Sequence, residues 1–250
     1  MDYSIVIALH NEEDNVEPVT AELRAVVDGR LDYEIVWVDD GSSDGTAARL
    51  QDVCRGWRQA RMLRHAERSG KSAALRSGIR AARAPWIITL DGDGQNDPTD
   101  ILVLVEALED APDGVDLVAG LRRRRADRLV KKVSSKVANA VRRKILGDGI
   151  RDSVCGLKVI RRDAYLELPY FDHMHRFFPA LIQRSGGKVI ARDVEDRERL
   201  HGASKYGFHN RFWVGIVDLL GVLWLQRRAT MAAADEIEVE RAVAAAEENG

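Results

Sequence analysis

The chain has 250 residues, of which 45% are hydrophobic and 31% charged, and its formal net charge is -2. A chain of this length can bury one sizeable core, so we expect one domain with a short appendage. Its two cysteines provide neither a disulfide framework nor a metal-ligand spacing, which fits a reducing compartment, and the start of the chain lacks the basic segment and apolar run of a signal peptide.

Predicted strands and helices alternate over the first hundred residues. Short apolar runs rich in Ile and Val predict strands at 3–9, 33–38, 61–63 and 86–90. Apolar periodicity and capping residues predict helices at 13–27, from 43 or 44 to 55, at 69–84, and from an N1 proline at Pro98 to 109. This alternation predicts an α/β fold, with a mostly parallel sheet that carries helices on both faces.

The second half of the chain is less regular. We expect strands at 115–120, 153–159 and 188–194, and a long basic helix at 129–146. The most hydrophobic segment, 212–225, is shorter than a membrane span of about 20 apolar residues and contains Asp218. Its flanking arginines and terminal tryptophans suit a helix lying in a membrane interface, and a helix packed on the domain or on a partner subunit fits equally well.

Charge is distributed unevenly along the chain. Residues 122–144 contain eleven basic residues and one acid, whereas 235–248 contain six acids and one arginine. The basic run fits a solvated helix face, a contact with a phosphorylated ligand, or a contact with anionic lipid headgroups. We expect the Ala- and Glu-rich segment from 231 onward to be a frayed helix or disordered.

Polar residues gather at the predicted ends of three strands. His10-Asn11-Glu12, Asp39-Asp40 and the run from Asp91 to Gln95 follow the first, second and fourth strands. Ligands of parallel α/β sheets bind at the carboxyl ends of strands, so we expect these residues to converge on one rim.

The run from Asp91 to Gln95 predicts a cation site. The side chains of Asp91, Asp93 and Gln95 alternate in sequence, so their oxygens can converge on one hard cation. Gly92 and Gly94 leave the backbone bare for a bulky anion. An acidic turn without a ligand is the alternative. Asp39 to Thr46 similarly predicts either a turn that binds a base or ribose hydroxyls, or a capped turn and nothing more.

Six segments together resemble a known family. Three polar runs carry the main resemblance: Asn11-Glu12-Glu13, Asp39 to Thr46, and Asp91 to Pro98. Three other segments extend it: Ser69 to Ala74, Ser153 to Arg162, and Arg199 to Tyr206. They resemble family-2 glycosyltransferases of the GT-A (Rossmann-like) fold, most closely the dolichyl-phosphate mannose synthase and polyprenyl-phosphate glycosyltransferase branch, over about residues 3 to 228.

The resemblance implies roles for individual residues. Donor-nucleotide positions fall on Ala8, His10, Glu12, Val38, Asp40, Lys71 and Gly92. The metal and donor-diphosphate positions are Asp91, Asp93 and Gln95, with Mg²⁺ or Mn²⁺ as the cofactor. Arg122 and Arg199 join the two aspartates in the catalytic set, and Lys131 or Lys132 together with Lys205 would hold the acceptor phosphate. The chain departs from the family pattern at Ala8 and His10, where proline and tyrosine are common, and in lacking transmembrane helices after the catalytic region.

The implied activity is an inverting, metal-dependent transfer of a hexose from a nucleotide-diphosphate sugar to a polyprenyl phosphate. A phosphomonoester acceptor is already largely dianionic at neutral pH, which argues against Asp97 and Asp152 as essential bases. Two alternatives stay open. The acceptor could be a soluble sugar or protein, or the chain could be a non-catalytic nucleotide-sugar-binding subunit of a membrane complex.

The sequence as a whole also predicts a domain arrangement and a set of partners. We expect a catalytic domain at 1–207, an amphipathic helix at 208–228 that contacts a membrane or a partner, and an acidic tail at 229–250. The expected location is the cytoplasmic membrane face. Besides the donor and the acceptor, the expected partner is a membrane surface or membrane protein and not a nucleic acid, and a homo-oligomer stays open.

Overall fold

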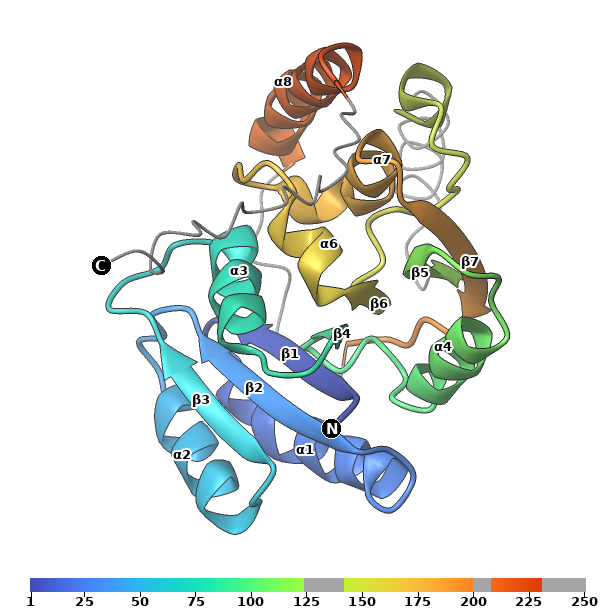
Figure 1. Ribbon diagram of the computed structural model, residues 1–250. Helices are drawn as coiled ribbons and strands as arrows, with labels where there is room; N and C mark the ends of the chain where they lie inside the picture. Colours follow the sequence, from blue (N-terminus) through green and yellow to red (C-terminus); the bar gives the residue numbers. More distant parts are fainter. Residues whose placement is uncertain (124–141, 200–207, 231–250) are drawn as a thin grey trace, which may run out of the picture.

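A seven-stranded sheet forms the centre of the computed structural model, which describes residues 1–123, 142–199 and 208–230. The strands are β1 (Tyr3–Leu9), β2 (Tyr33–Asp39), β3 (Ala60–Arg64), β4 (Trp86–Asp91), β5 (Val115–Arg122), β6 (Lys158–Arg161) and β7 (Lys188–Val194). Their order across the sheet is β3-β2-β1-β4-β6-β5-β7 (Figure 1). Only β6 runs antiparallel to its neighbours among these strands, so the expected mostly parallel α/β sheet is confirmed.

Successive residues of the inner strands point to opposite faces, so each strand supplies both halves of the core. In β1, Ile5 and Ile7 join one buried cluster, whereas Val6 joins the other. All three side chains are fully buried. Burial on both faces explains why these strands are near-continuous apolar runs in the sequence.

Helices cover both faces of the sheet. One face carries α1 (Glu13–Val27), α2 (Thr46–Gly56) and α4 (Asp100–Glu109), and the other carries α3 (Lys71–Ala81), α6 (Arg162–Leu166) and α7 (Phe178–Arg184). A short 3-10 helix, η1 (Met174–Arg176), precedes α7. This three-layer arrangement places all the βα loops after β1 to β4 at one edge of the sheet.

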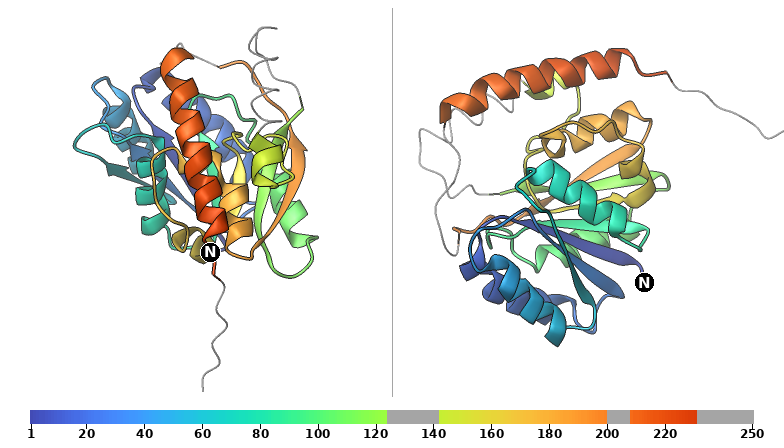
Figure 2. Two further views of the ribbon diagram at one scale, coloured as in Figure 1. Left: turned by 90° about the horizontal axis from the view of Figure 1, so that it is seen from above. Right: turned by 90° about the vertical axis from the view of Figure 1, so that its left-hand side faces the viewer.

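The last described helix, α8 (Phe208–Arg227), lies across the outside of α7 (Figure 2). Val222 is fully buried in the core cluster of that face, and Leu219, Leu223 and Leu225 pack against it. The opposite side of α8 exposes Val217, Leu220 and Trp224, with exposed fractions of 67%, 58% and 59%. No helix in the described part of the chain is long and apolar enough to cross a membrane.

Several predicted boundaries differ from the structure. The strand predicted at 153–159 is wrong in its first five residues, because β6 begins only at Lys158 and a turn precedes it. Pro98 is not the N1 residue of α4, which begins at Asp100 after a turn in which the Asp97 carbonyl accepts from the Asp100 amide at 3.1 Å. The helix predicted at 69–84 is shorter at both ends, and most of the helix predicted at 129–146 lies outside the described residues.

Candidate functional site

Three strand ends meet at one level of the sheet, as the polar runs predicted. Ala8 on β1 is in register with Val38 on β2 and with Asp91 on β4. The loops that follow these residues therefore share one rim. The chain moves outward from β1 to β3 and then returns to the other side of β1 as β4, so this rim is also the point at which strand order reverses.

Arg199 joins two of these strand ends. Its Nη1 lies 3.2 Å from Oε1 of Glu12, which follows β1, and its Nη2 lies 2.8 Å from Oδ2 of Asp93, which follows β4. All three side chains are largely buried. The structure therefore brings together three residues that the sequence assigned to one site.

Asp91 is the last residue of β4, and its carboxylate contacts the ammonium of Lys71, the first residue of α3. Burial alone raises the pKa of the Asp91 carboxyl, but the charge and hydrogen bond of Lys71 bring the net pKa below its ordinary value. The pKa of Asp93 is raised, first by burial and then by the negative charge of Asp91, which Arg199 offsets in part. Two adjacent carboxylates thus repel each other in a largely buried place.

This carboxylate pair suits a divalent cation. Carboxylate and amide oxygens are the ligands that Mg²⁺ and Mn²⁺ prefer, and a cation would relieve the repulsion that raises the pKa of Asp93. Gln95, Asp91 and Asp93 each keep part of their surface exposed, while Gly92 and Gly94 between them are buried. Within 1–123, 142–199 and 208–230, no three His, Cys, Asp or Glu side chains gather as a metal-ligand cluster.

Asp40 holds the loop that leads into α3 in place. Asp40 is 4% exposed, and its carboxylate accepts the backbone N–H groups of Ser69 and Gly70 at 2.9 and 2.8 Å. Its Oδ1 also lies 2.8 Å from Nδ1 of His65. Burial raises the pKa of Asp40, whereas these three contacts lower it, and the net pKa falls below its ordinary value. The carboxylate assigned to the nucleotide therefore fixes the loop that leads into α3.

The remaining nucleotide positions differ in what they present to the rim. The Val38 side chain is fully buried against α3, so only its backbone can face a ligand there. Ala8 is half-buried, and Nδ1 of His10 lies 2.8 Å from the Asp40 carbonyl oxygen. Gly92 is buried, and a Cβ there would lie 2.7 Å from Cγ of Leu9, so close packing by itself requires glycine.

Arg122 is already paired. Its Nε and Nη2 donate to the two Asp152 oxygens at 2.7 and 3.2 Å, and Nη1 lies 3.8 Å from Asp196. Burial lowers the pKa of Arg122, but the hydrogen bond and the charge of Asp152 outweigh it, so the net pKa is raised. The acceptor residues Lys131, Lys132 and Lys205 lie outside the described residues.

Two residues beside Asp91 are not among the site residues that the sequence predicts. Lys158 is 3% exposed at the start of β6, and its charge lowers the pKa of Asp91. Gly156 lies against the Asp91 carboxylate. The motif from Ser153 to Arg162 contains both residues, but only the pairing of β6 with β4 reveals their neighbour.

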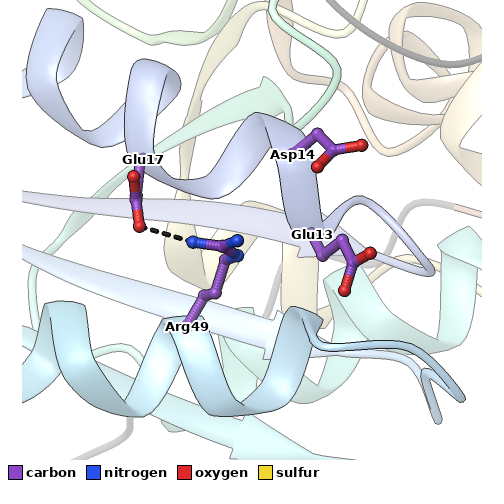
Figure 3. Close-up of a pocket in the computed structure, with 4 residues that line it drawn as sticks. All are labelled: Glu13, Asp14, Glu17 and Arg49. Carbon is purple, nitrogen blue, oxygen red and sulfur yellow. Dashed lines mark hydrogen bonds and ion pairs between the residues drawn. The ribbon is translucent and has the colours of Figure 1, made fainter.

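A separate surface hollow lies between the N-terminal halves of α1 and α2 (Figure 3). Glu13, Asp14, Glu17 and Arg49 line it. Arg49 Nη1 donates to Glu17 Oε1 at 2.6 Å, and Glu13 Oε2 accepts the Gly45 amide at 2.6 Å. These contacts tie the two helices together beside the rim.

The chain is similar in sequence to known proteins. The model of "Glycosyl transferase family 2" matches residues 4–168. The chain is 35% identical over 232 residues to the dodecaprenyl-phosphate galacturonate synthase of Rhizobium johnstonii, covering 91% of this chain and 68% of that protein. It is 33% identical over 207 residues to the undecaprenyl-phosphate 4-deoxy-4-formamido-L-arabinose transferase of Aeromonas hydrophila, covering 82% of this chain and 62% of that protein. The chain therefore spans about two thirds of the length of these relatives.

A solved structure shares the fold. The glucosyl-3-phosphoglycerate synthase from Mycobacterium tuberculosis, crystallised with Mn²⁺, uridine diphosphate and glucosyl-3-phosphoglycerate, superposes with a TM-score of 0.67. The match covers 90% of this chain and 79% of that one at 20% identity, which establishes likeness of fold.

Proposed function

Because the chain belongs to glycosyl transferase family 2 and has its GT-A fold, we propose that it transfers a sugar from a nucleotide-diphosphate donor to a polyprenyl phosphate. The observation that carries the proposal is the rim, where Arg199 bridges Glu12 and Asp93 beside the Asp91–Lys71 pair. Both relatives are named for a polyprenyl phosphate but for different sugars. We therefore extend only the acceptor class to this chain.

The donor half of the proposed site consists of two carboxylates and two cationic side chains. Asp91 and Asp93, with the amide of Gln95, would hold Mg²⁺ or Mn²⁺. The cation, when bound, neutralises charge on the leaving diphosphate. Lys71 and Arg199 already lie at these carboxylates, so both can add positive charge beside the diphosphate. The fit of the carboxylate pair to a divalent cation supports this assignment.

The acceptor half needs positioning more than a base. The acceptor phosphate oxygen forms a bond to the anomeric carbon while the bond from that carbon to the diphosphate breaks on the opposite side, which inverts the anomeric centre. A phosphomonoester is largely dianionic at neutral pH, so no proton has to be removed. Both oxygens of the Asp152 carboxylate accept hydrogen bonds from Arg122. This pairing supports a transfer that does not use Asp152 as a base.

The test is a transfer assay with a polyprenyl phosphate in detergent. Asp93→Ala should abolish transfer, and EDTA should abolish it in the unsubstituted protein. Asp163→Ala, which removes an 84% exposed carboxylate on α6, should retain full activity. Full activity in EDTA would contradict the proposal. Transfer to free sugars but not to polyprenyl phosphate would favour a soluble acceptor, and metal-dependent nucleotide binding without any transfer would favour a binding subunit.

We further propose that α8 rests on an anionic membrane surface. Val217, Leu220 and Trp224 form an exposed apolar stripe on its outer side, and Arg227 and Arg228 are exposed at its end. Apolar side chains followed by arginines suit the boundary between acyl chains and anionic headgroups. Such an orientation would bring a lipid-borne acceptor close to the protein.

Vesicle sedimentation tests this orientation. Leu220→Ser should weaken binding to vesicles of anionic phospholipid at least several-fold, whereas Leu166→Ser, at an exposed leucine on α6, should not. Unchanged vesicle binding by Leu220→Ser, or a fall in oligomer mass on that substitution, would contradict the membrane assignment. The second result would instead indicate that α8 contacts another copy of the chain.

A further inference from the structure

The segment before β6 runs alongside the end of β4. Thr89 of β4 is opposite Lys158 of β6, and the two strands are antiparallel. Asp91 lies two residues after Thr89 and Gly156 two residues before Lys158, so these two residues are opposite each other. The Thr89 hydroxyl donates to the Gly156 carbonyl oxygen at 2.6 Å, which holds the two segments together beyond the end of β6. The side chain of residue 91 and any side chain of residue 156 would therefore compete for one space.

The Asp91 carboxylate fills that space. A Cβ on residue 156 would lie closer than 3.0 Å to Cγ and to both carboxylate oxygens of Asp91, a separation that real Cβ atoms essentially never show. Even alanine at position 156 is therefore incompatible with the observed position of this carboxylate. Glycine in a strand-like segment commonly marks such a close approach.

The segment around Gly156 cannot easily retreat from Asp91. Cys155 and Leu157 on either side are fully buried. The Leu157 carbonyl oxygen accepts the Gly120 amide of β5 at 3.1 Å, on the side away from β4. A Cβ on Gly120 would itself lie 2.9 Å from that oxygen and 3.2 Å from Cys155 Sγ, so β5 is already packed tightly against the segment. Any side chain at position 156 must consequently displace the Asp91 carboxylate.

We propose that Gly156 is a positioning residue, whose missing side chain creates the place that the Asp91 carboxylate occupies. The steric part of this inference depends only on the packing of β4, β5 and the segment before β6. Its functional consequence rests on the proposed function: Asp91 supplies one of two carboxylates for the cation, so Gly156 determines where that ligand stands relative to Asp93.

A double-mutant cycle on thermal stability, measured in EDTA, tests the steric part. Gly156→Ala should lower Tm in the otherwise unsubstituted protein, since the displaced Asp91 carboxylate gives up its contact with Lys71. In the Asp91→Ala background, where the three clashing atoms are gone, the same substitution should lower Tm by less than half as much. Gly56→Ala is the matched control, because a Cβ there would meet nothing within 4 Å, and it should leave Tm nearly unchanged.

Mn²⁺ titration followed by electron paramagnetic resonance tests the functional part. Gly156→Ala should weaken Mn²⁺ binding at least tenfold, and Gly56→Ala should not. If Gly156→Ala alone does not fold, its rescue by Asp91→Ala would support the proposal. Equal losses of Tm in both backgrounds, failure of both Gly156 variants to fold, or unchanged Tm and Mn²⁺ affinity would overturn it. If the unsubstituted protein binds no Mn²⁺, the proposed function fails, whereas the thermal cycle still decides the steric inference.

Discussion

At the scale of single residues, Lys158 has an unusual environment. Its ammonium donates to the Cys155 carbonyl oxygen and lies 5.9 Å from the centre of the Phe178 ring, and the residue is 3% exposed. Burial is the main reason that the pKa of Lys158 falls to about 8 from its ordinary 10.5, and the charge of Lys71 lowers it further. The folded protein therefore releases this proton at a lower pH than the unfolded chain does.

This difference in pKa makes stability depend on pH. Between pH 8 and 10.5 the unfolded chain binds more protons at Lys158 than the folded protein, so the free energy of unfolding rises with pH. From pH 7.5 to 9.5 this residue should add about 2 kcal/mol. Urea unfolding should show that gain as a growing difference between the unsubstituted protein and Lys158→Met. Lys188→Met removes an exposed lysine, so its free energy of unfolding should change with pH as that of the unsubstituted protein does. The same pH dependence in Lys158→Met would contradict this interpretation.

At the scale of elements, α8 offers the same residue type on its two sides. Val222 is fully buried against the core cluster, whereas Val217 is 67% exposed. Val222→Ala should lower the free energy of unfolding by about 2 kcal/mol, because it removes buried methyl groups and leaves a cavity. Val217→Ala should change it by less than about 0.5 kcal/mol. Chemical unfolding of the two variants is the measurement, and equal losses would mean that α8 does not pack as described.

The elements also show what the sequence determines by itself. The predicted bounds at 3–9, 13–27 and 188–194 coincide with β1, α1 and β7, because apolar periodicity and the flanking polar residues are local signals. The turn before β6 has the composition of a strand, because it contains the apolar residues Val154, Cys155 and Leu157, and the sequence therefore predicts a strand there. Cys155 and Leu157 are buried by contact with β5, which no local pattern specifies.

The candidate site divides in the same way. Three polar strand ends were predictable, because the carboxyl ends of parallel strands share an edge. The partners of Asp40 were not, since the N–H groups of Ser69 and Gly70 come from a loop whose path depends on the whole fold. Gly156 was also missed, because its neighbour Asp91 can be identified only once the direction of β6 is known.

At the scale of the whole molecule, the proposed donor site joins distant parts of the chain. Glu12 and Asp93 follow strands on either side of the point where strand order reverses, and Arg199 reaches both from the segment after β7. A ligand bound at this rim contacts only the folded arrangement, so it should stabilise the entire fold by mass action.

A panel of nucleoside diphosphates with and without Mn²⁺ tests this coupling and identifies the donor base. At a concentration one hundred times its dissociation constant, the correct nucleotide should add about 2.7 kcal/mol and raise Tm by roughly 5 °C or more. EDTA should remove the shift, and so should Asp93→Ala, because both remove the cation that links the carboxylates to the diphosphate. Asp163→Ala should keep the shift, since its carboxylate is exposed on α6. A shift of the same size in EDTA, or one retained in Asp93→Ala, would mean that the nucleotide binds without the cation, and the carboxylate pair would then need another role.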